Sequence, residues 1–124
     1  MKEKKQTKIR ITESQLITSI IQYCNYAHIF CYKSKTVGIY NAKEKKFYKD
    51  WYITKGIPDL TIIINGYYLG IECKVGKNKQ SPDQIEFERK IKSSGGGYMV
   101  VYSLDEFVKT ITAILKYANE KGKN

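Results

Sequence analysis

Two acidic residues, Asp59 and Glu72, lie on either side of Asn65-Gly66 in the stretch "GIPDLTIIINGYYLGIECKVG". An Asn-Gly pair between two apolar runs predicts a two-residue β-hairpin. Counting outward from that turn places Asp59 directly opposite Glu72, with their side chains about 5 Å apart on one face. Like charges at this separation repel, so the pair requires a compensating charge.

A divalent cation would remove the repulsion, because Mg²⁺ takes oxygen ligands and keeps several waters. Lys74 lies two residues beyond Glu72 and therefore shares its face of the strand. Its amine could orient a water, help to deprotonate it, or offset charge on a phosphate. The alternative is a surface hairpin whose carboxylates point into solvent, with Lys74 as an ion-pair partner. The charges alone leave these two interpretations equally open.

Two further polar residues fall on apolar stripes of predicted helices. Glu13 heads the stripe of the first helix, and Gln84 is in register with the apolar residues of the second. Each also has a purely structural explanation. Glutamate favours a helix N-terminus, and Gln84 is the far end of a capping box with Ser81. Both together, beside the acidic pair, favour a functional site.

The elements that must position these residues follow from apolar periodicity, caps and breakers. They are a helix over residues 12–30, a strand near 36–40, hairpin strands over 59–64 and 67–75, a helix opened by Ser81 and Pro82 and closed by Gly95, a buried strand over 98–103, and a helix from Ser103 to about 119. The order αβββαβα predicts an α/β fold with a mixed central sheet flanked by helices. We interpret residues 1–124 as one domain, with residues 1–10 as a basic N-terminal arm.

The chain carries 22 Lys and Arg against 12 Asp and Glu, a net charge of +10. Lysines interleave with aromatic residues between residues 33 and 55, including Tyr40, Phe47, Tyr48 and Trp51. Basic and aromatic residues together suit a phosphate backbone and stacked bases. The alternative is a solvated lysine-rich surface, which we rank second.

Other function classes find little support. His28 is the only histidine, so a nucleophile–histidine system has one possible base, and no partner residues support it. No apolar run reaches the length of a membrane span, and no signal peptide is recognisable at the basic N-terminus. Three cysteines without a CxxC pair suit a reducing cytoplasm.

The run "GIPDL" followed by "ECK" resembles the PD-(D/E)xK nuclease pattern. With Glu13 on a preceding helix, "SPDQ" at the start of the next one and "GGGYMVVYSLDE" after it, the chain resembles the VRR-NUC family of virus-type replication-repair nucleases. The resemblance extends from about residue 13 to 106 and is to stand-alone phage and bacterial members, which implies the cytoplasm of a bacterial cell or of a phage-infected bacterial host. It implies a restriction-endonuclease-like core.

The resemblance also implies roles for individual residues. The implied ligands of Mg²⁺ (or Mn²⁺) are Asp59, Glu72 and the backbone carbonyl of Cys73, with Glu13 as a further acidic residue of the site, Lys74 as the catalytic lysine and Gln84 as its support. A homodimer acting on branched DNA is implied as well. Its interface is expected in the C-terminal half of the first helix and the basic segment after it, because "YCNYAHIFCY" (residues 23–32) carries more apolar surface than one core-facing stripe requires. The alternative is a helix buried on two sides within a monomer.

Taken together, these features predict a Mg²⁺-dependent, structure-specific DNA endonuclease that acts on branched DNA such as Holliday junctions, in replication, repair or recombination. Two alternatives stay open. One is a DNA-binding module without catalysis, which needs the positive charge but not the acidic face. The other is restriction-type cleavage of a short duplex sequence.

Overall fold

The computed structural model describes residues 10–35, 39–44, 46–48 and 54–121. Its elements are α1 (Glu13–Tyr26), β1 (Cys31–Lys33), β2 (Ile39–Asn41), β3 (Lys46–Tyr48), β4 (Leu60–Ile64), β5 (Tyr67–Cys73), α2 (Pro82–Ser93), β6 (Gly97–Val101) and α3 (Leu104–Lys121). The basic arm predicted over residues 1–10 lies almost entirely outside the described residues.

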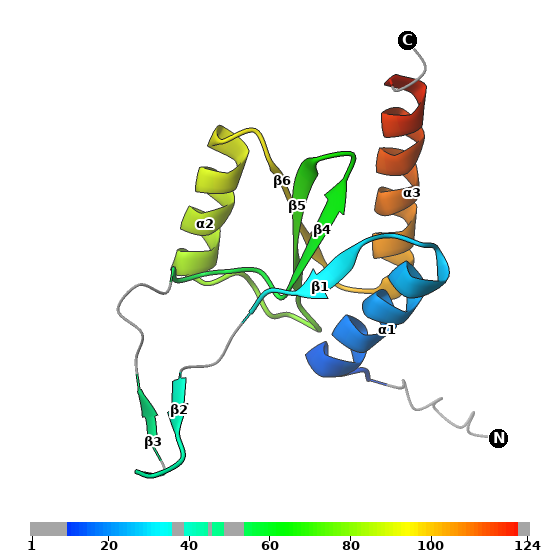
Figure 1. Ribbon diagram of the computed structural model, residues 1–124. Coiled ribbons are helices and arrows are strands. Elements are labelled where there is room, and N and C mark those ends of the chain that lie inside the picture. The colour runs from blue at the N-terminus through cyan, green and yellow to red at the C-terminus, as the bar shows by residue number, and fades with distance from the viewer. Residues whose placement is uncertain (1–9, 36–38, 45, 49–53, 122–124) are drawn as a thin grey trace, which may run out of the picture.

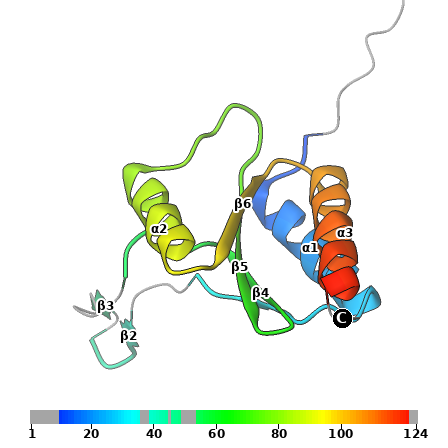
Figure 2. The same cartoon turned by 90° about the horizontal axis from the view of Figure 1, so that it is seen from above.

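Four of these strands form the main sheet, in the order β1-β4-β5-β6. The pairs β1/β4 and β4/β5 are antiparallel, and β5/β6 is parallel. Helix α2 covers one face of the sheet, while α1 and α3 lie together on the other (Figure 2). The predicted α/β fold with a mixed, helix-flanked sheet is therefore confirmed.

The central hairpin has the register that the Asn-Gly turn predicts. Ile64 pairs with Tyr67, and the last pair of the ladder is Leu60 with Ile71. The next position outward therefore sets Asp59 opposite Glu72. Asn65 adopts φ +49° and Gly66 φ +80°, the positive values that this kind of two-residue turn requires.

The first helix is shorter than predicted. It begins at Glu13 with the expected capping box of Thr12 and Gln15, but it ends at Tyr26 rather than near residue 30. His28 then adopts φ +57°, a left-handed conformation that redirects the chain. Residues 31–33 leave the helix and pair with β4 as strand β1. Apolar periodicity continued past the helix end, and hydrogen bonding to β4 overrode it.

The strand predicted near residues 36–40 is only partly testable, because residues 36–38 lie outside the described residues. Residues 39–41 form β2, which pairs with β3 in a separate two-stranded sheet and not with the main one. This small sheet projects from the body of the molecule near the lower end of the main sheet (Figure 1).

The second half of the chain follows the predicted order. Helix α2 has the Ser81 and Gln84 capping box with Pro82 at its start, and Gly95 adopts φ +90° just after its end. Ser103 caps α3 by accepting a hydrogen bond from the backbone N–H of Glu106 at 3.1 Å. The predicted elements in this region are correct to within about two residues.

The core lies between the sheet and the pair α1 and α3. It consists of Leu16, Ile20, Cys24, Ile29, Leu60, Ile62, Ile64, Leu69, Ile71, Cys73, Val101, Phe107 and Ile111. The three cysteines are free thiols. Within the described ranges no helix is long and apolar enough to cross a membrane.

Candidate active site

The acidic pair lies at the end of the sheet opposite the hairpin turn. Asp59 immediately precedes β4, and Glu72 is the last residue but one of β5. Their exposed fractions are only 7% and 1%. The carboxylates therefore do not point into solvent, and the surface-hairpin interpretation is excluded.

Asp59 is held in place by backbone groups. Its Oδ2 accepts a hydrogen bond of 2.8 Å from the N–H of Cys73. Ser34, which follows β1, donates its backbone N–H to the carbonyl of Asp59 at 3.0 Å and its hydroxyl to the carbonyl of Pro58 at 2.8 Å. The second carboxylate oxygen, Oδ1, lies 3.8 Å from the amine of Lys35.

Glu72 has one oxygen with partners and one without. Its Oε1 accepts a hydrogen bond of 2.9 Å from the side-chain amide of Gln84 and lies 3.6 Å from the amine of Lys74. Its Oε2 is buried and has no hydrogen-bond partner. A buried polar atom is normally satisfied, so an oxygen left open in this place indicates a ligand.

Gln84 reaches Glu72 because of how α2 begins. Its Oε1 accepts from the backbone N–H of Ser81 at 2.8 Å, which leaves its amide N–H₂ free to donate to Glu72. The Gln84 side chain therefore forms the predicted helix cap through its oxygen and the predicted contact with the site through its nitrogen.

Gly56 fixes the distance between the start of α2 and the loop that carries Asp59. It adopts φ +80°, and a Cβ there would fall on the backbone carbonyl of Asp83. Only glycine allows this close approach without strain. We infer that Gly56 positions the site without belonging to it.

Burial and the neighbouring charge of Asp59 raise the pKa of Glu72 from 4.5 to about 7, against the smaller opposing effects of Lys35 and Lys74. The closeness of the Asp59 carboxyl group therefore favours the protonated form of Glu72. A proton on Glu72 and a cation bound between the two carboxyl groups would relieve the same repulsion.

The pair fits a hard divalent cation. All available donors are oxygens, two of them anionic, and Glu72 Oε2 lacks any other partner. Among the described residues no group of three His, Cys, Asp or Glu side chains comes together as a metal site. Asp59 and Glu72 would therefore need backbone oxygen, water or substrate oxygen to complete the coordination.

Glu13 lies nearby at the start of α1, half-buried at the head of the buried stripe. Its charge helps to raise the pKa of the Cys73 thiol to about 12, after burial and the larger effects of Asp59 and Glu72. Glu13 is thus close to the end of β5 that carries Glu72 and Cys73. Its role as a ligand, like the metal-binding role of the Cys73 carbonyl, remains a prediction.

Ser34 and Lys35 are not among the residues predicted for this site. Their positions depend on β1, whose register with β4 brings residue 34 opposite residue 59. The sequence predicted no strand between residue 30 and residue 36, so this pairing was not foreseen. The basic character of residues 33–55 was the one available signal for Lys35.

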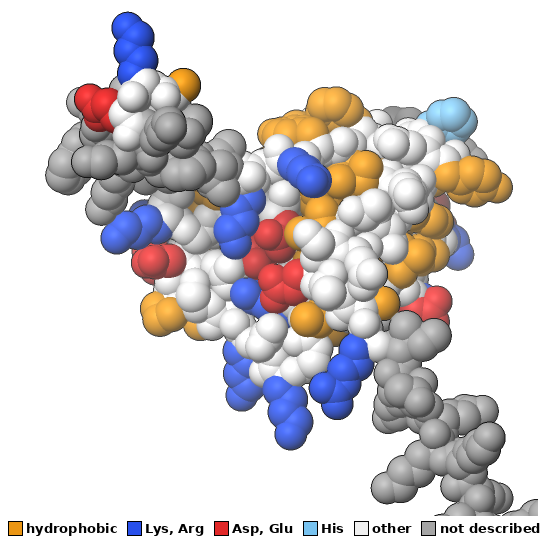
Figure 3. All heavy atoms as spheres, turned by 90° about the horizontal axis from the view of Figure 1, so that it is seen from below, with side chains coloured by type: hydrophobic (Ala, Val, Ile, Leu, Met, Phe, Trp, Pro, Cys, Tyr) orange, Lys and Arg blue, Asp and Glu red, His pale blue; other side chains and the backbone are white. Residues whose placement is uncertain are grey.

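The face around the acids is basic. Figure 3 views the end of the sheet opposite the hairpin turn, with acidic side chains in the middle of this face and lysines and arginines around them. A hollow of about 310 Å³ adjoins Gln84 and Lys35, and Lys55, Gly56 and Ser81 also line it. This arrangement suits a phosphate next to the acidic pair.

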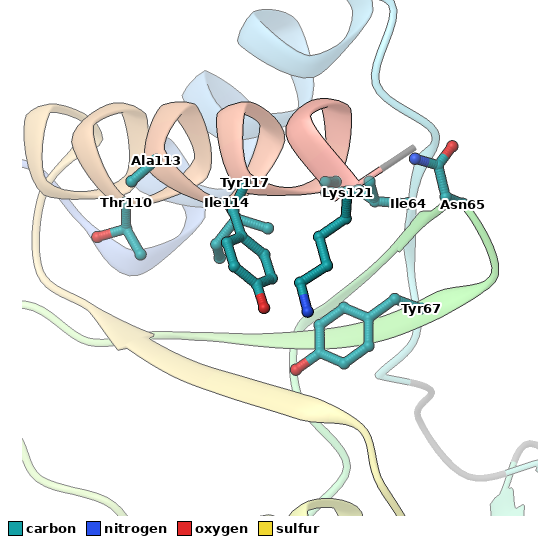
Figure 4. A pocket seen from close by; sticks show the side chains of 9 residues that line it. Ile64, Asn65, Tyr67, Thr110, Ala113, Ile114, Tyr117 and Lys121 are labelled. Atoms are coloured by element: carbon teal, nitrogen blue, oxygen red, sulfur yellow. The ribbon is translucent and has the colours of Figure 1, made fainter. Parts of the chain in front are cut away.

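A wider hollow lies elsewhere. It has a volume of about 910 Å³ and lies between α3 and the tip of the hairpin, with Tyr67 on one side and Ile114 and Tyr117 on the other (Figure 4). The described residues that line it include no carboxylate. Its size does not make it a site for hydrolysis.

Comparisons with known proteins bear on the fold. A solved structure described as a "VRR_NUC domain protein" is similar to this chain with a TM-score of 0.60 and 23% sequence identity, over 84% of this chain and 88% of the other. The chain matches no protein-family profile and no curated protein. At this identity the likeness concerns the fold. The chain thus has a fold like that of the VRR_NUC domain protein, and the resemblance noted in the sequence is confirmed at the level of the fold.

Proposed function

We propose that the protein is a metal-dependent nuclease of the VRR-NUC type that hydrolyses phosphodiester bonds in DNA. The observation that carries the proposal is a buried pair of carboxylates, Asp59 and Glu72, with one oxygen unpartnered and a lysine 3.6 Å from the other. Burying two like charges lowers the stability of the folded protein, and a role in catalysis would explain why the pair is present. The nuclease likeness of the fold supports the same reading.

Each residue of the site has a distinct part in this proposal. Asp59 and Glu72 would hold Mg²⁺ or Mn²⁺, which when bound polarises the scissile phosphate and activates a water. Lys74, with a side chain only 12% exposed, would offset charge that develops on the phosphate. Gln84 orients Glu72 through its 2.9 Å hydrogen bond, and Lys35 would hold a neighbouring phosphate.

The substrate proposed is branched DNA, with the four-way junction as the principal form. Two symmetric cuts in a junction need two active sites related by a two-fold axis, and one chain of this size offers one. The proposal therefore includes a homodimer.

Exposed aromatic residues supply material for its interface. Tyr26 is 84% exposed and Phe30 64%, and the ring of Phe30 lies 5.7 Å from that of Tyr32 on the edge strand β1. Replacing Tyr26 and Phe30 with serine should shift the mass in sedimentation equilibrium from two chains to one. A single-chain mass for the unaltered protein at micromolar concentration would contradict the dimer.

The function itself is tested by incubating the protein with linear duplex, flap and four-way-junction DNA, in Mg²⁺ and in EDTA. We expect cleavage in Mg²⁺ alone, fastest on the junction, and none by Asp59→Ala purified in parallel. Cleavage of linear duplex at one short sequence would favour the restriction-type alternative. Binding without cleavage of any substrate would favour the non-catalytic module and contradict the proposal.

A further inference from the structure

A second basic hollow lies close to the acidic pair. Its volume is about 520 Å³, and the described residues that line it are Arg10, Ile11, Val75, Gly76, Lys77 and Tyr102. Two cations and one partly exposed aromatic ring thus meet in one concave place. Cationic grooves that contain an aromatic platform suit single nucleotides, because the charges hold phosphate and the ring stacks on a base.

This hollow is on the opposite side of the acids from Lys35. Residues 10 and 11 lead into α1, which covers the other face of the sheet from α2 (Figure 2). Val75 directly follows Lys74, and Lys77 lies five positions after Glu72, a span of at most about 17 Å of extended chain. One strand of DNA rises about 3.4 Å per nucleotide, so the hollow is within about five nucleotides of the acids.

A hydrogen bond holds the Tyr102 side chain in place at the hollow. Its hydroxyl donates a hydrogen bond of 2.9 Å to the backbone carbonyl of Asn78, while 39% of the residue stays exposed. The bond ties the end of β6 to the loop that carries Lys77. The ring and the amine therefore keep a fixed relation to each other, which lowers the entropy lost when a ligand binds.

We infer that this hollow is a nucleotide subsite beside the cleavage centre, in which Arg10 and Lys77 hold one backbone phosphate and the Tyr102 ring stacks on an unpaired base. The inference rests on the proposed nuclease function and adds the path of the bound strand. That strand would run across the end of the sheet, from the hollow lined by Lys35 and Lys55, past the acids, to the hollow lined by Tyr102. A base in duplex DNA offers no free face, so the ring acts only on unpaired nucleotides.

Binding by Asp59→Ala tests the subsite, since this background is expected to bind DNA without cutting it. The probes are a fluorescent single-stranded 20-mer and the duplex of the same sequence. Adding Tyr102→Ala should weaken single-strand binding about 10-fold and duplex binding by less than about threefold. Tyr102→Trp keeps a stacking surface and should retain the single-strand affinity.

Lys77→Ala supplies an independent readout. It should weaken binding of both probes and lower the slope of log affinity against log salt by about one. The matched control is Lys116→Ala, an exposed lysine in the half of α3 far from the site, which should leave the affinity for both probes within about twofold (Figure 1).

Equal losses from Lys77→Ala and Lys116→Ala, or unchanged single-strand binding in Tyr102→Ala, would overturn the subsite. These readouts need no hydrolysis, so they are separate from the test of the proposed function. An unaltered protein that never cleaves DNA but shows the expected binding pattern would overturn the nuclease and still support the subsite.

Discussion

The two ends of the β4–β5 hairpin show opposite ways of using the same pair of strands. At the turn, Ile64 and Tyr67 border a wide apolar hollow against α3. At the other end, two carboxylates are buried opposite each other, with lysines on both sides. The apolar hollow places no like charges together. At the acidic end, by contrast, the carboxylates of Asp59 and Glu72 repel each other, and Glu72 Oε2 has no hydrogen-bond partner.

The difference shows where function is to be sought in this molecule. An apolar hollow follows from packing a helix over a hairpin and needs no further explanation. A buried pair of like charges destabilises the fold, so another requirement must retain it. Substitutions at the acidic end should therefore alter cleavage strongly, and substitutions at the turn end should not.

The largest effect is expected for Asp59→Ala. Losing one anionic ligand should remove the cation and with it several kcal/mol of transition-state stabilisation, a loss in rate of roughly 10³-fold or more. DNA affinity should stay within a few-fold, because the basic face is unchanged. Single-turnover cleavage and fluorescence anisotropy measure the two quantities, and an unchanged cleavage rate would contradict the nuclease assignment.

Gln84→Ala should have a smaller effect on cleavage. It removes the hydrogen bond that orients Glu72 but leaves both carboxylates, so a roughly 10- to 100-fold loss is expected. Ser81→Ala is the matched control, because it removes the cap hydroxyl that Gln84 N–H donates to and keeps the contact with Glu72. An equal loss of cleavage rate in the two variants would mean that the structure of the start of α2, and not the hydrogen bond to Glu72, accounts for the effect of Gln84→Ala.

The stability of the metal-free protein should depend on pH through Glu72. Its pKa is raised from 4.5 to about 7 on folding, so between these values the folded protein binds a proton that the unfolded chain has lost. The free energy of unfolding should therefore fall as pH rises through this interval and level off above it. Thermal melts from about pH 5 to about pH 8 measure this, and the decrease should be weaker in Glu72→Gln.

The smallest effect is expected at the turn end. Tyr117 is 60% exposed beside the apolar hollow. Tyr117→Ala should leave cleavage unchanged and alter the free energy of unfolding by less than about 1 kcal/mol. A loss of cleavage comparable to that of Gln84→Ala would remove the contrast between the two ends.

Much of the acidic end could be predicted because it depends on local rules. The Asn-Gly turn fixes the hairpin register, and the register alone brings Asp59 opposite Glu72. The Ser81 cap likewise fixes where Gln84 begins, though its hydrogen bond to Glu72 is a tertiary contact. What local rules cannot give is the depth of burial, because it depends on the helices packed around the strands.

Lys35 shows most clearly which part of the site could not be predicted from the sequence. It reaches Asp59 only because β1 pairs with β4, a contact between segments far apart in the sequence. Three residues of strand carry too little periodicity to be distinguished from the end of a helix. The tight approach of Gly56 to Asp83 is equally a product of tertiary packing.

Asp59 and Glu72 should form a cation site, and calorimetric titration of Mn²⁺ into the metal-free protein at about pH 8 measures binding there. We predict saturable binding by the unaltered protein and its loss in Glu72→Gln, which removes an anionic ligand with little change in shape. Affinity in the unaltered protein should rise with pH up to about 7, where Glu72 loses its proton. Equal Mn²⁺ binding by the two proteins would mean that Asp59 and Glu72 do not form the cation site.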